Sequence, residues 1–414
     1  MQARVHCYSA SMPDASLNQL LKIRPFMRFW LARLGGIAAN QILLVAVSWH
    51  LYDITGSAWD LGLVGLFQFL PALLMTLPAG HLADRLHRGR IFAACMAVQA
   101  ALALLLVAAT QGGFATRGLI FGISIVLGLA RAFQMPAQQA LTPLLVPQAL
   151  LARAVAVSSS GVQVAVIGGP ALGGLLYTQG ASTVYLTCAG LLVLSCALAL
   201  AVHYRHQPAT DSATWRTVLA GVEFVWRHKL LLGATSLDLF AVLLGGATAL
   251  LPIYARDILH TGPQGLGLLR AAPAVGALAM SLVLARWPLQ RHVGHKLLAA
   301  VAVFGLATVV FGVSEHFLLS LLALAVTGAA DNISVVTRQT LVQLETPDAM
   351  RGRVAAVNSI FIGASNQLGE FESGATAALF GPVGSVVMGG VGTVLVAALW
   401  LRLFPALARR DRMV

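Results

Sequence analysis

The sequence predicts an all-α integral membrane protein with twelve transmembrane helices in two six-helix repeats. Composition, the length of the apolar runs and an internal repeat carry this prediction. Of the 414 residues, 58% are hydrophobic and 10% are charged, and the mean hydropathy is +0.81. A soluble protein contains about 25% charged residues. A water-soluble core cannot hide this much apolar surface, so lipid is the expected solvent.

The apolar runs match the roughly 20 residues that a membrane-spanning helix needs. Backbone groups in lipid must be hydrogen-bonded within their own segment, so these runs are expected to be helices rather than open strands. The first six are expected at 26–52, 58–83, 90–111, 115–136, 151–178 and 182–202, and the second six at 230–255, 263–286, 295–313, 317–339, 353–380 and 384–404.

The longest polar stretch divides the chain into two halves. The expected parts are a cytoplasmic tail (1–25), a six-helix bundle (26–202), a cytoplasmic linker (203–229), a second six-helix bundle (230–404) and a second cytoplasmic tail (405–414). The linker segment from Trp215 to Arg227 has apolar side chains at helical spacing, which predicts an amphipathic helix along the membrane surface.

The basic residues predict the orientation of the chain. The formal net charge is +12, but the basic residues lie in small clusters between apolar runs, which argues against a nucleic-acid partner. With both termini on one side, 23 basic residues fall on that side and two, Arg117 and Arg256, on the other. Cytoplasmic loops carry the excess of Lys and Arg, so both termini, the linker and the loop at 80–90 are expected to be cytoplasmic.

The sequence offers little to support an enzyme. It has no Gly-rich phosphate loop with Lys, no metal-ligand cluster and no defensible nucleophile–base pair, so neither a cofactor nor a metal is expected. Cys95, Cys188 and Cys196 lie inside apolar runs and imply no disulfide framework. The first 24 residues lack the apolar region of a cleaved signal peptide. No ATPase is implied, so a proton gradient is the expected energy source, with sodium as an alternative.

The two halves contain an internal repeat at an offset of 200 residues. Residues 128–160 and 328–360 are identical at 11 of 33 positions without gaps. Apolar bias explains some of these matches, but it does not explain why Gly, Gln, Pro and Arg fall in register. Parallel repeats place a binding site between the halves, near the bilayer midplane, and rocking of the halves gives alternating access to it.

The stretch "GHLADRLHRGR" at 80–90 carries a motif as well as charge. Gly80, Leu82, Ala83, Asp84, Arg85 and Arg88 resemble the loop signature of the major facilitator superfamily, with His87 where Gly is usual and Gly89 where a basic residue is usual. The resemblance covers essentially the whole chain. It implies a latch in which Gly80 allows close helix packing and Asp84 binds a helix N-terminus, Arg131 or Arg353. The alternative is that Arg85, Arg88 and Arg90 only set the topology.

The fifth predicted helix contains "GGPALGG", which resembles the antiporter motif of exporters in the superfamily. Gly169, Pro170, Gly173 and Gly174 carry the match. This implies export over import, although a purely packing role is the alternative. The stretches 51–57, 131–147, 345–359 and 363–374 resemble the branch of bacterial enterobactin exporters and macrolide efflux proteins. That branch implies a bacterial plasma membrane, but its cargoes are chemically diverse.

Charged side chains within predicted spans are costly, at least about 2.5–3.5 kcal/mol each, and therefore need an explanation. Arg33 and Asp238 lie at similar depths and form a candidate gate. Asp331 is a further candidate for proton coupling or for a charge in the cavity. The alternative for Asp331 is a structural network with Arg338. Glu370 is the first candidate for proton coupling and Asp238 the second. Glu372 points about 160° away from Glu370 around the helix, so only one of them is expected to face a cavity. Asn40, Gln41 and Gln68 are candidate cavity residues.

The function predicted from these features is a proton-coupled exporter of a small organic molecule, either a siderophore-like metabolite or an amphipathic drug such as a macrolide. A carboxylate that alternates between a dry and a wet environment can bind a proton on one side and release it on the other. Two alternatives remain: an importer or uniporter of the same fold, and a transporter-like receptor or assembly partner that transports nothing.

Overall fold

The computed structural model describes residues 17–204, 215–289 and 291–411. Eleven helical stretches in this part of the chain are long and apolar enough to cross a membrane. The last, within α14 (Asp348–Leu403), is broken at Gly381, which has non-helical φ 76° and ψ 162° and is followed by Pro382. Each side of this break is longer than a bilayer requires, so α14 crosses twice. The chain is therefore an all-helical, multi-pass membrane protein.

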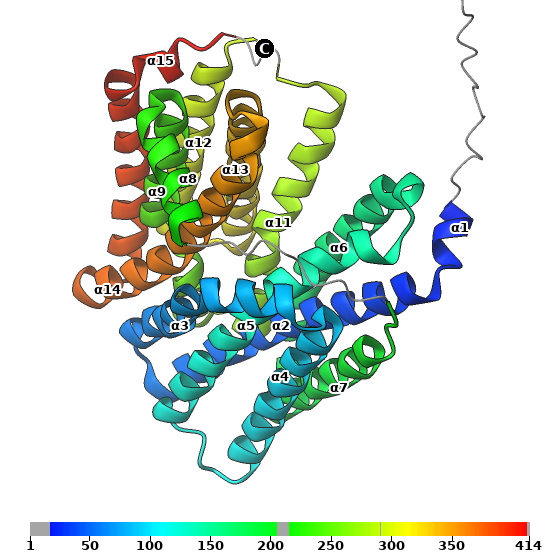
Figure 1. The fold of residues 1–414 in the computed structure, drawn as a ribbon. Helices are drawn as coiled ribbons and strands as arrows, with labels where there is room; N and C mark the ends of the chain where they lie inside the picture. Colours follow the sequence, from blue (N-terminus) through cyan, green and yellow to red (C-terminus); the bar gives the residue numbers. More distant parts are fainter. Residues whose placement is uncertain (1–16, 205–214, 290, 412–414) are drawn as a thin grey trace, which may run out of the picture.

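The helices fall into two groups (Figure 1). After the short α1 (Leu17–Leu21), the first group comprises α2 (Arg24–Thr55), α3 (Ala58–Arg85), α4 (Arg88–Gln111), α5 (Arg117–Leu145), α6 (Leu151–Tyr177) and α7 (Ala181–Leu200), with the 3₁₀ turn η1 (Gln148–Leu150) before α6. The second comprises α8 (Trp215–Arg227), α9 (Lys229–Gly245), α11 (Gly262–Arg286), α12 (Val293–Val313), α13 (Phe317–Glu345), α14 and α15 (Pro405–Ala408). We call these groups the first and second bundles.

The predicted helix at 230–255 is not continuous. It ends at Gly245 and is followed by the 3₁₀ turn η2 (Ala247–Leu250), the single turn α10 (Leu251–Ile253) and the π-helical η3 (Tyr254–Ile258). Gly246 has φ −73° and ψ 61°, outside the helical region, and its carbonyl accepts a hydrogen bond from Ser373 Oγ at 2.8 Å. A partner outside the helix thus satisfies a carbonyl at the break, as a membrane interior requires.

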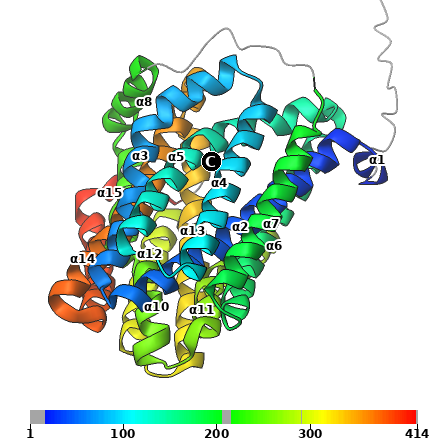
Figure 2. The ribbon, with the colours of Figure 1, turned by 90° about the horizontal axis from the view of Figure 1, so that it is seen from below.

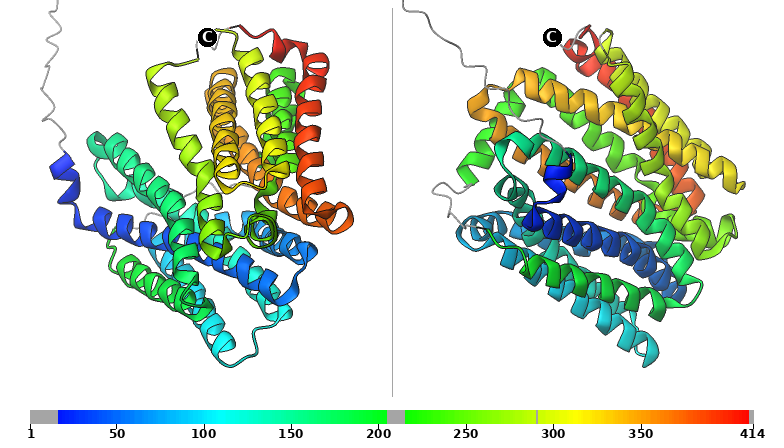
Figure 3. Two further views of the ribbon diagram at one scale, coloured as in Figure 1. Left: turned by 180° about the vertical axis from the view of Figure 1, so that it is seen from behind. Right: turned by 90° about the vertical axis from the view of Figure 1, so that its right-hand side faces the viewer.

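The two bundles pack side by side, and α8 belongs to the second (Figures 2 and 3). Val222 and Val225 of α8 pack with Val354 and Val357 of α14. A Cβ at Gly221 would lie 2.8 Å from the Arg353 carbonyl oxygen, so the two backbones approach closely. The amphipathic helix therefore covers the second bundle with its apolar face, while Trp226 stays exposed.

The internal repeat reappears in the packing. The bounds of α5 and α13 are related by the same offset of 200 residues. A Cβ at Gly128 of α5 would lie 2.2 Å from the Gln68 carbonyl oxygen of α3, and one at Gly328 of α13 would lie 1.8 Å from that of Pro273 in α11. No side chain fits in either place, which explains why glycine occupies both positions of the repeat.

The bundles contact each other at two helix crossings. In one, Gly374 of α14 lies so close to α3 that its Cβ would be 2.6 Å from the Gly62 Cα atom. In the other, a Cβ at Gly174 of α6 would lie 3.0 Å from the Gly267 Cα atom of α11. Gly62 lies near the start of α3, and the basic residues Arg85 and Arg88 lie at its far end. We call the end with these arginines the basic side. Both crossings lie toward the opposite side, so the bundles are closed there.

Candidate functional site

A cluster of three charged side chains lies where the bundles meet. Glu370 of α14 interacts electrostatically with Arg270 of α11 and with Arg131 of α5, which belongs to the first bundle. All three side chains are half-buried. A Cβ at Gly65 of α3 would lie 3.0 Å from the Glu370 Oε2 atom, so the carboxylate lies directly against the first bundle. We call Arg131, Arg270 and Glu370 the interface triad.

Amide side chains extend the triad into the first bundle. Arg131 Nη1 donates a hydrogen bond to Gln68 Oε1 at 3.4 Å. Asn40, Gln68, Arg131 and Leu127 line a cavity of about 20 Å³, which is enough for a water molecule. Gln41 lies elsewhere, since a Cβ at Gly169 would be 2.6 Å from the Gln41 Cβ atom. Two of the three predicted cavity residues thus lie together.

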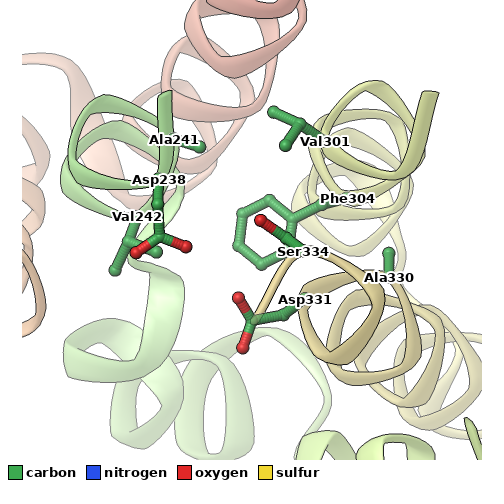
Figure 4. Close-up of a pocket in the computed structure, with 8 residues that line it drawn as sticks. All are labelled: Asp238, Ala241, Val242, Val301, Phe304, Ala330, Asp331 and Ser334. Atoms are coloured by element: carbon green, nitrogen blue, oxygen red, sulfur yellow. The ribbon is translucent and has the colours of Figure 1, made fainter. Parts of the chain in front are cut away.

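A second charged cluster lies inside the second bundle, and Figure 4 shows its two carboxylates, Asp238 and Asp331. Arg338 of α13 forms an ion pair with Asp238 of α9 at 2.9 Å and donates to Asn358 Oδ1 at 2.7 Å. Asp331 interacts electrostatically with Asp238 and with Arg338. Asp238 and Asp331 point into a cavity of about 10 Å³. We call Asp238, Asp331 and Arg338 the bundle cluster.

Arg338 determines what the bundle cluster can do. Its side chain is 1% exposed and is the largest fully buried side chain of the described residues. A buried charge must be paired, and one guanidinium balances only one of the two carboxylates. One of them therefore needs a proton or another cation for neutrality. Arg33, the gate partner considered for Asp238, instead donates to Ser158 Oγ at 2.8 Å within the first bundle.

A third polar contact closes the side opposite the basic loops. Asp53 of α2 forms an ion pair with Arg256 of η3 at 3.0 Å, and the Tyr52 hydroxyl donates to Asp257 Oδ2. The Arg256 guanidinium also lies over the Tyr52 ring, 5.6 Å from its centroid. We call these four residues the clasp, because it joins the two bundles.

The glycines of the predicted antiporter motif have separate partners. A Cβ at Gly173 would lie 3.1 Å from the Ile42 Cα atom, so Gly173, like Gly169, packs on α2 within the first bundle. Gly174 crosses to α11, and a Cβ at Gly267 would lie 2.4 Å from the Pro170 carbonyl oxygen. The expected packing across the halves therefore rests on Pro170 and Gly174.

The predicted latch is only partly visible. The side chain of Asp84 lies outside the described part of the structure. A Cβ at Gly80 would meet no described atom within 4 Å, so the expected close approach is not formed there. Arg131 binds Gln68, which lies 16 residues before Asp84, about 24 Å along α3. In this structure Arg131 therefore does not contact the loop at 80–90. The exposed Arg353 packs its backbone against α8.

Sequence reasoning missed the clasp and did not pair Arg338 with Asp238. The sequence signal for the clasp is an acid, Asp53, beside Tyr52 on the side with few charges. Both basic residues predicted on that side have acidic partners: Arg256 pairs with Asp53, and Arg117 pairs with Asp60 at 2.6 Å.

Comparisons with known proteins agree with this architecture. A family model described as "Transmembrane secretion effector" (MFS_3) matches residues 16–412. The chain is 29% identical to the enterobactin exporter EntS of Citrobacter koseri, over 94% of each chain. It is 24% identical to the uncharacterized MFS-type transporter YjbB of Bacillus subtilis, over 92% of this chain and 93% of that one. The nucleoside transporter NupG (D323A mutant) superposes with a TM-score of 0.75 at 13% identity, over 92% and 100% of the chains. At that identity, the likeness to NupG concerns the fold alone.

Proposed function

The chain belongs to the MFS_3 family of transmembrane secretion effectors, which are transporters of the major facilitator superfamily and not enzymes, and we propose that it is a proton-coupled exporter of a small organic molecule. The proposed location is a bacterial inner membrane, with the basic side in the cytoplasm. The similarity to enterobactin exporters supports export, and a siderophore-like metabolite or an amphipathic drug such as a macrolide is the proposed cargo.

The interface triad is the observation that carries the coupling mechanism. Ionised Glu370 interacts with two arginines, one from each bundle, and compensates one of their two positive charges at the place where α3 and α14 meet. Protonated Glu370 leaves Arg131 and Arg270 uncompensated, and their repulsion weakens the contact between the bundles. A proton on Glu370 therefore favours the form in which the side opposite the basic loops is open.

Linkage makes this relation reciprocal. If protonation favours opening of that side, then opening favours protonation, and closing favours proton release. Protons are taken up when the site faces outward and released when it faces the cytoplasm. This inward proton flow has the direction that drives export of another molecule. The bundle cluster, with two carboxylates for one arginine, is the second candidate for proton binding.

The test is efflux from a bacterial host that lacks its own pumps. Cells are loaded with macrolides, catechol siderophores or fluorescent amphiphiles, and the wild type is compared with Glu370→Gln and Glu372→Gln at matched expression. Glu372 is the control because it lies two residues away and is also half-buried, but has no electrostatic interaction with an arginine among the described residues.

The proposal expects efflux that an uncoupler collapses, that Glu370→Gln abolishes and that Glu372→Gln retains. Uncoupler-sensitive efflux that survives Glu370→Gln moves the coupling to Asp238 or Asp331. Accumulation of the cargo by energised cells overturns export.

A further inference from the structure

A groove on the first bundle is separate from the interface triad. It has a volume of about 620 Å³, within the usual range of about 300–1,000 Å³ for ligand sites. Its walls come from the end of α3, the first half of α4 and the middle of α5. They are almost entirely apolar and include Leu82, Leu86, Ala94, Val98, Leu129 and Phe133.

The groove and the triad use different faces of α5. Leu127 and Arg131, four residues apart, face the small cavity beside Gln68, whereas Leu129 and Phe133, also four apart, face the groove. Residues four apart share one face of a helix, so the two pairs define two faces. The groove is therefore not part of the cavity that the triad borders.

One end of the groove carries positive charge. Arg90 and His87 line it at the start of α4, on the basic side. The Arg90 side chain is exposed, and its guanidinium makes no hydrogen bond or ion pair within the described residues. His87 packs against the Tyr204 ring, with centroids 4.4 Å apart. A single available guanidinium thus lies at the mouth of an apolar groove.

The depth of the groove matches half of a bilayer. From Arg90 to Val98 the helix rises by about 12 Å, and one leaflet of hydrocarbon is about 15 Å thick. Leu86, Ala94 and Val98 are exposed, so in the membrane they face lipid. An occupant with an apolar chain of this length and an anionic group at the basic side matches both features.

We propose that this groove binds an anionic phospholipid of the leaflet on the basic side, with an acyl chain between α3 and α4 and its phosphate on Arg90. The lipid fills the space between the end of α3 and the start of α4, which have few direct contacts of their own. It thereby supports the loop at 80–90 that joins them. This site does not depend on the identity of the cargo or on the coupling mechanism.

The test uses the purified full-length protein in detergent and native mass spectrometry with added lipid. The probes are palmitoyl-oleoyl phosphatidylglycerol, the phosphatidylcholine with the same chains, and inorganic phosphate. The variants are Arg90→Gln, which removes the charge, and Ala94→Phe, which fills the groove. Arg286→Gln is the control, because Arg286 is also exposed at the basic end of a helix but lies on α11 of the second bundle.

The expected result is preferential binding of phosphatidylglycerol. Arg90→Gln should weaken that binding about fivefold, the usual contribution of one basic residue at an anionic lipid surface, and weaken phosphatidylcholine binding less, because the choline cation offsets the charge of its phosphate. Ala94→Phe should reduce the binding of both lipids, and Arg286→Gln neither. Equal binding of the two lipids by the wild type overturns the role of charge. Phosphatidylglycerol binding that survives both groove variants overturns the site, as does binding of phosphate alone at the same affinity.

Discussion

The two crossings between the bundles share closely packed glycines but differ in charge. At each, glycine brings two backbones together: Gly174 with Gly267 in one, and Gly374 with Gly62 in the other. The internal offset of 200 residues relates Gly174 to Gly374 and also relates Pro170 to Glu370. The α6–α11 crossing thus has a proline where the α3–α14 crossing has an ionisable group between two arginines.

The two copies of the repeat therefore respond differently to protonation. Glycine crossings hold the bundles together by close packing, which does not depend on pH. A carboxylate at only one of them makes that crossing alone sensitive to protonation. We expect the α6–α11 crossing to act as a pivot and the α3–α14 crossing to respond to the proton.

The largest expected effect comes from destroying a crossing. In Gly174→Val or Gly374→Val the new side chain meets backbone atoms at 2.3–2.6 Å, which cannot move aside. Overpacking costs about 1–3 kcal/mol, so the form closed on the side opposite the basic loops should lose population roughly 5- to 150-fold. Spin labels at Gln111→Cys and Glu315→Cys, in a background without native cysteines, measure the distance between the bundles on that side.

Gly168→Val is the matched control for this prediction. Gly168 lies on the same helix as Gly174, but its Cβ would meet nothing within 4 Å. An unchanged distance distribution in Gly174→Val, or an equal change in Gly168→Val, would show that the glycine crossing does not hold the bundles together.

The second prediction tests the charge that separates the two crossings. In Glu370→Gln the spin-label distance should lose its pH dependence, whereas Pro170→Ala should retain it. The populations of the open and closed forms, taken from the spin-label distances, also allow a double-mutant cycle of Glu370→Gln with Arg131→Gln. This cycle should give a coupling free energy of about 0.5–3 kcal/mol, the range for residues of one charge network. Additive effects of the two substitutions would contradict an interaction across the bundle interface.

The smallest expected effect concerns the clasp. Arg256 and Asp53 are 40% and 56% exposed, and exposed ion pairs contribute about 0–1 kcal/mol. Arg256→Gln should therefore shift the population of the closed form by at most about fivefold, and the shift should shrink at high salt. A shift as large as that of Gly374→Val would mean that the clasp, rather than the crossings, keeps this side closed.

Sequence periodicity and charge identified the membrane-spanning helices and the repeat, because apolar run length and local spacing are local properties. The break at Gly245–Gly246 was missed, since two adjacent glycines in an apolar run give no signal of the Ser373 hydroxyl that bonds to the freed carbonyl. Contacts between residues far apart in the sequence could not be predicted either. Arg338 lies 100 residues from Asp238, and a Cβ at Gly80 would meet no described atom within 4 Å. Both facts depend on how helices are placed relative to one another.

The clasp also has a mechanical consequence. It joins the end of α2, an unbroken helix of 32 residues, to η3, a π-helical turn that is separated from the 3₁₀ turn η2 only by the single turn α10. A regular helix resists bending, whereas short 3₁₀ and π segments have weaker hydrogen-bond geometry and yield first. When the bundles separate, we expect α2 to move as a rigid helix and the segment from Gly246 to Ile258 to change its backbone conformation. Bending is therefore expected in this segment of the second bundle rather than in α2.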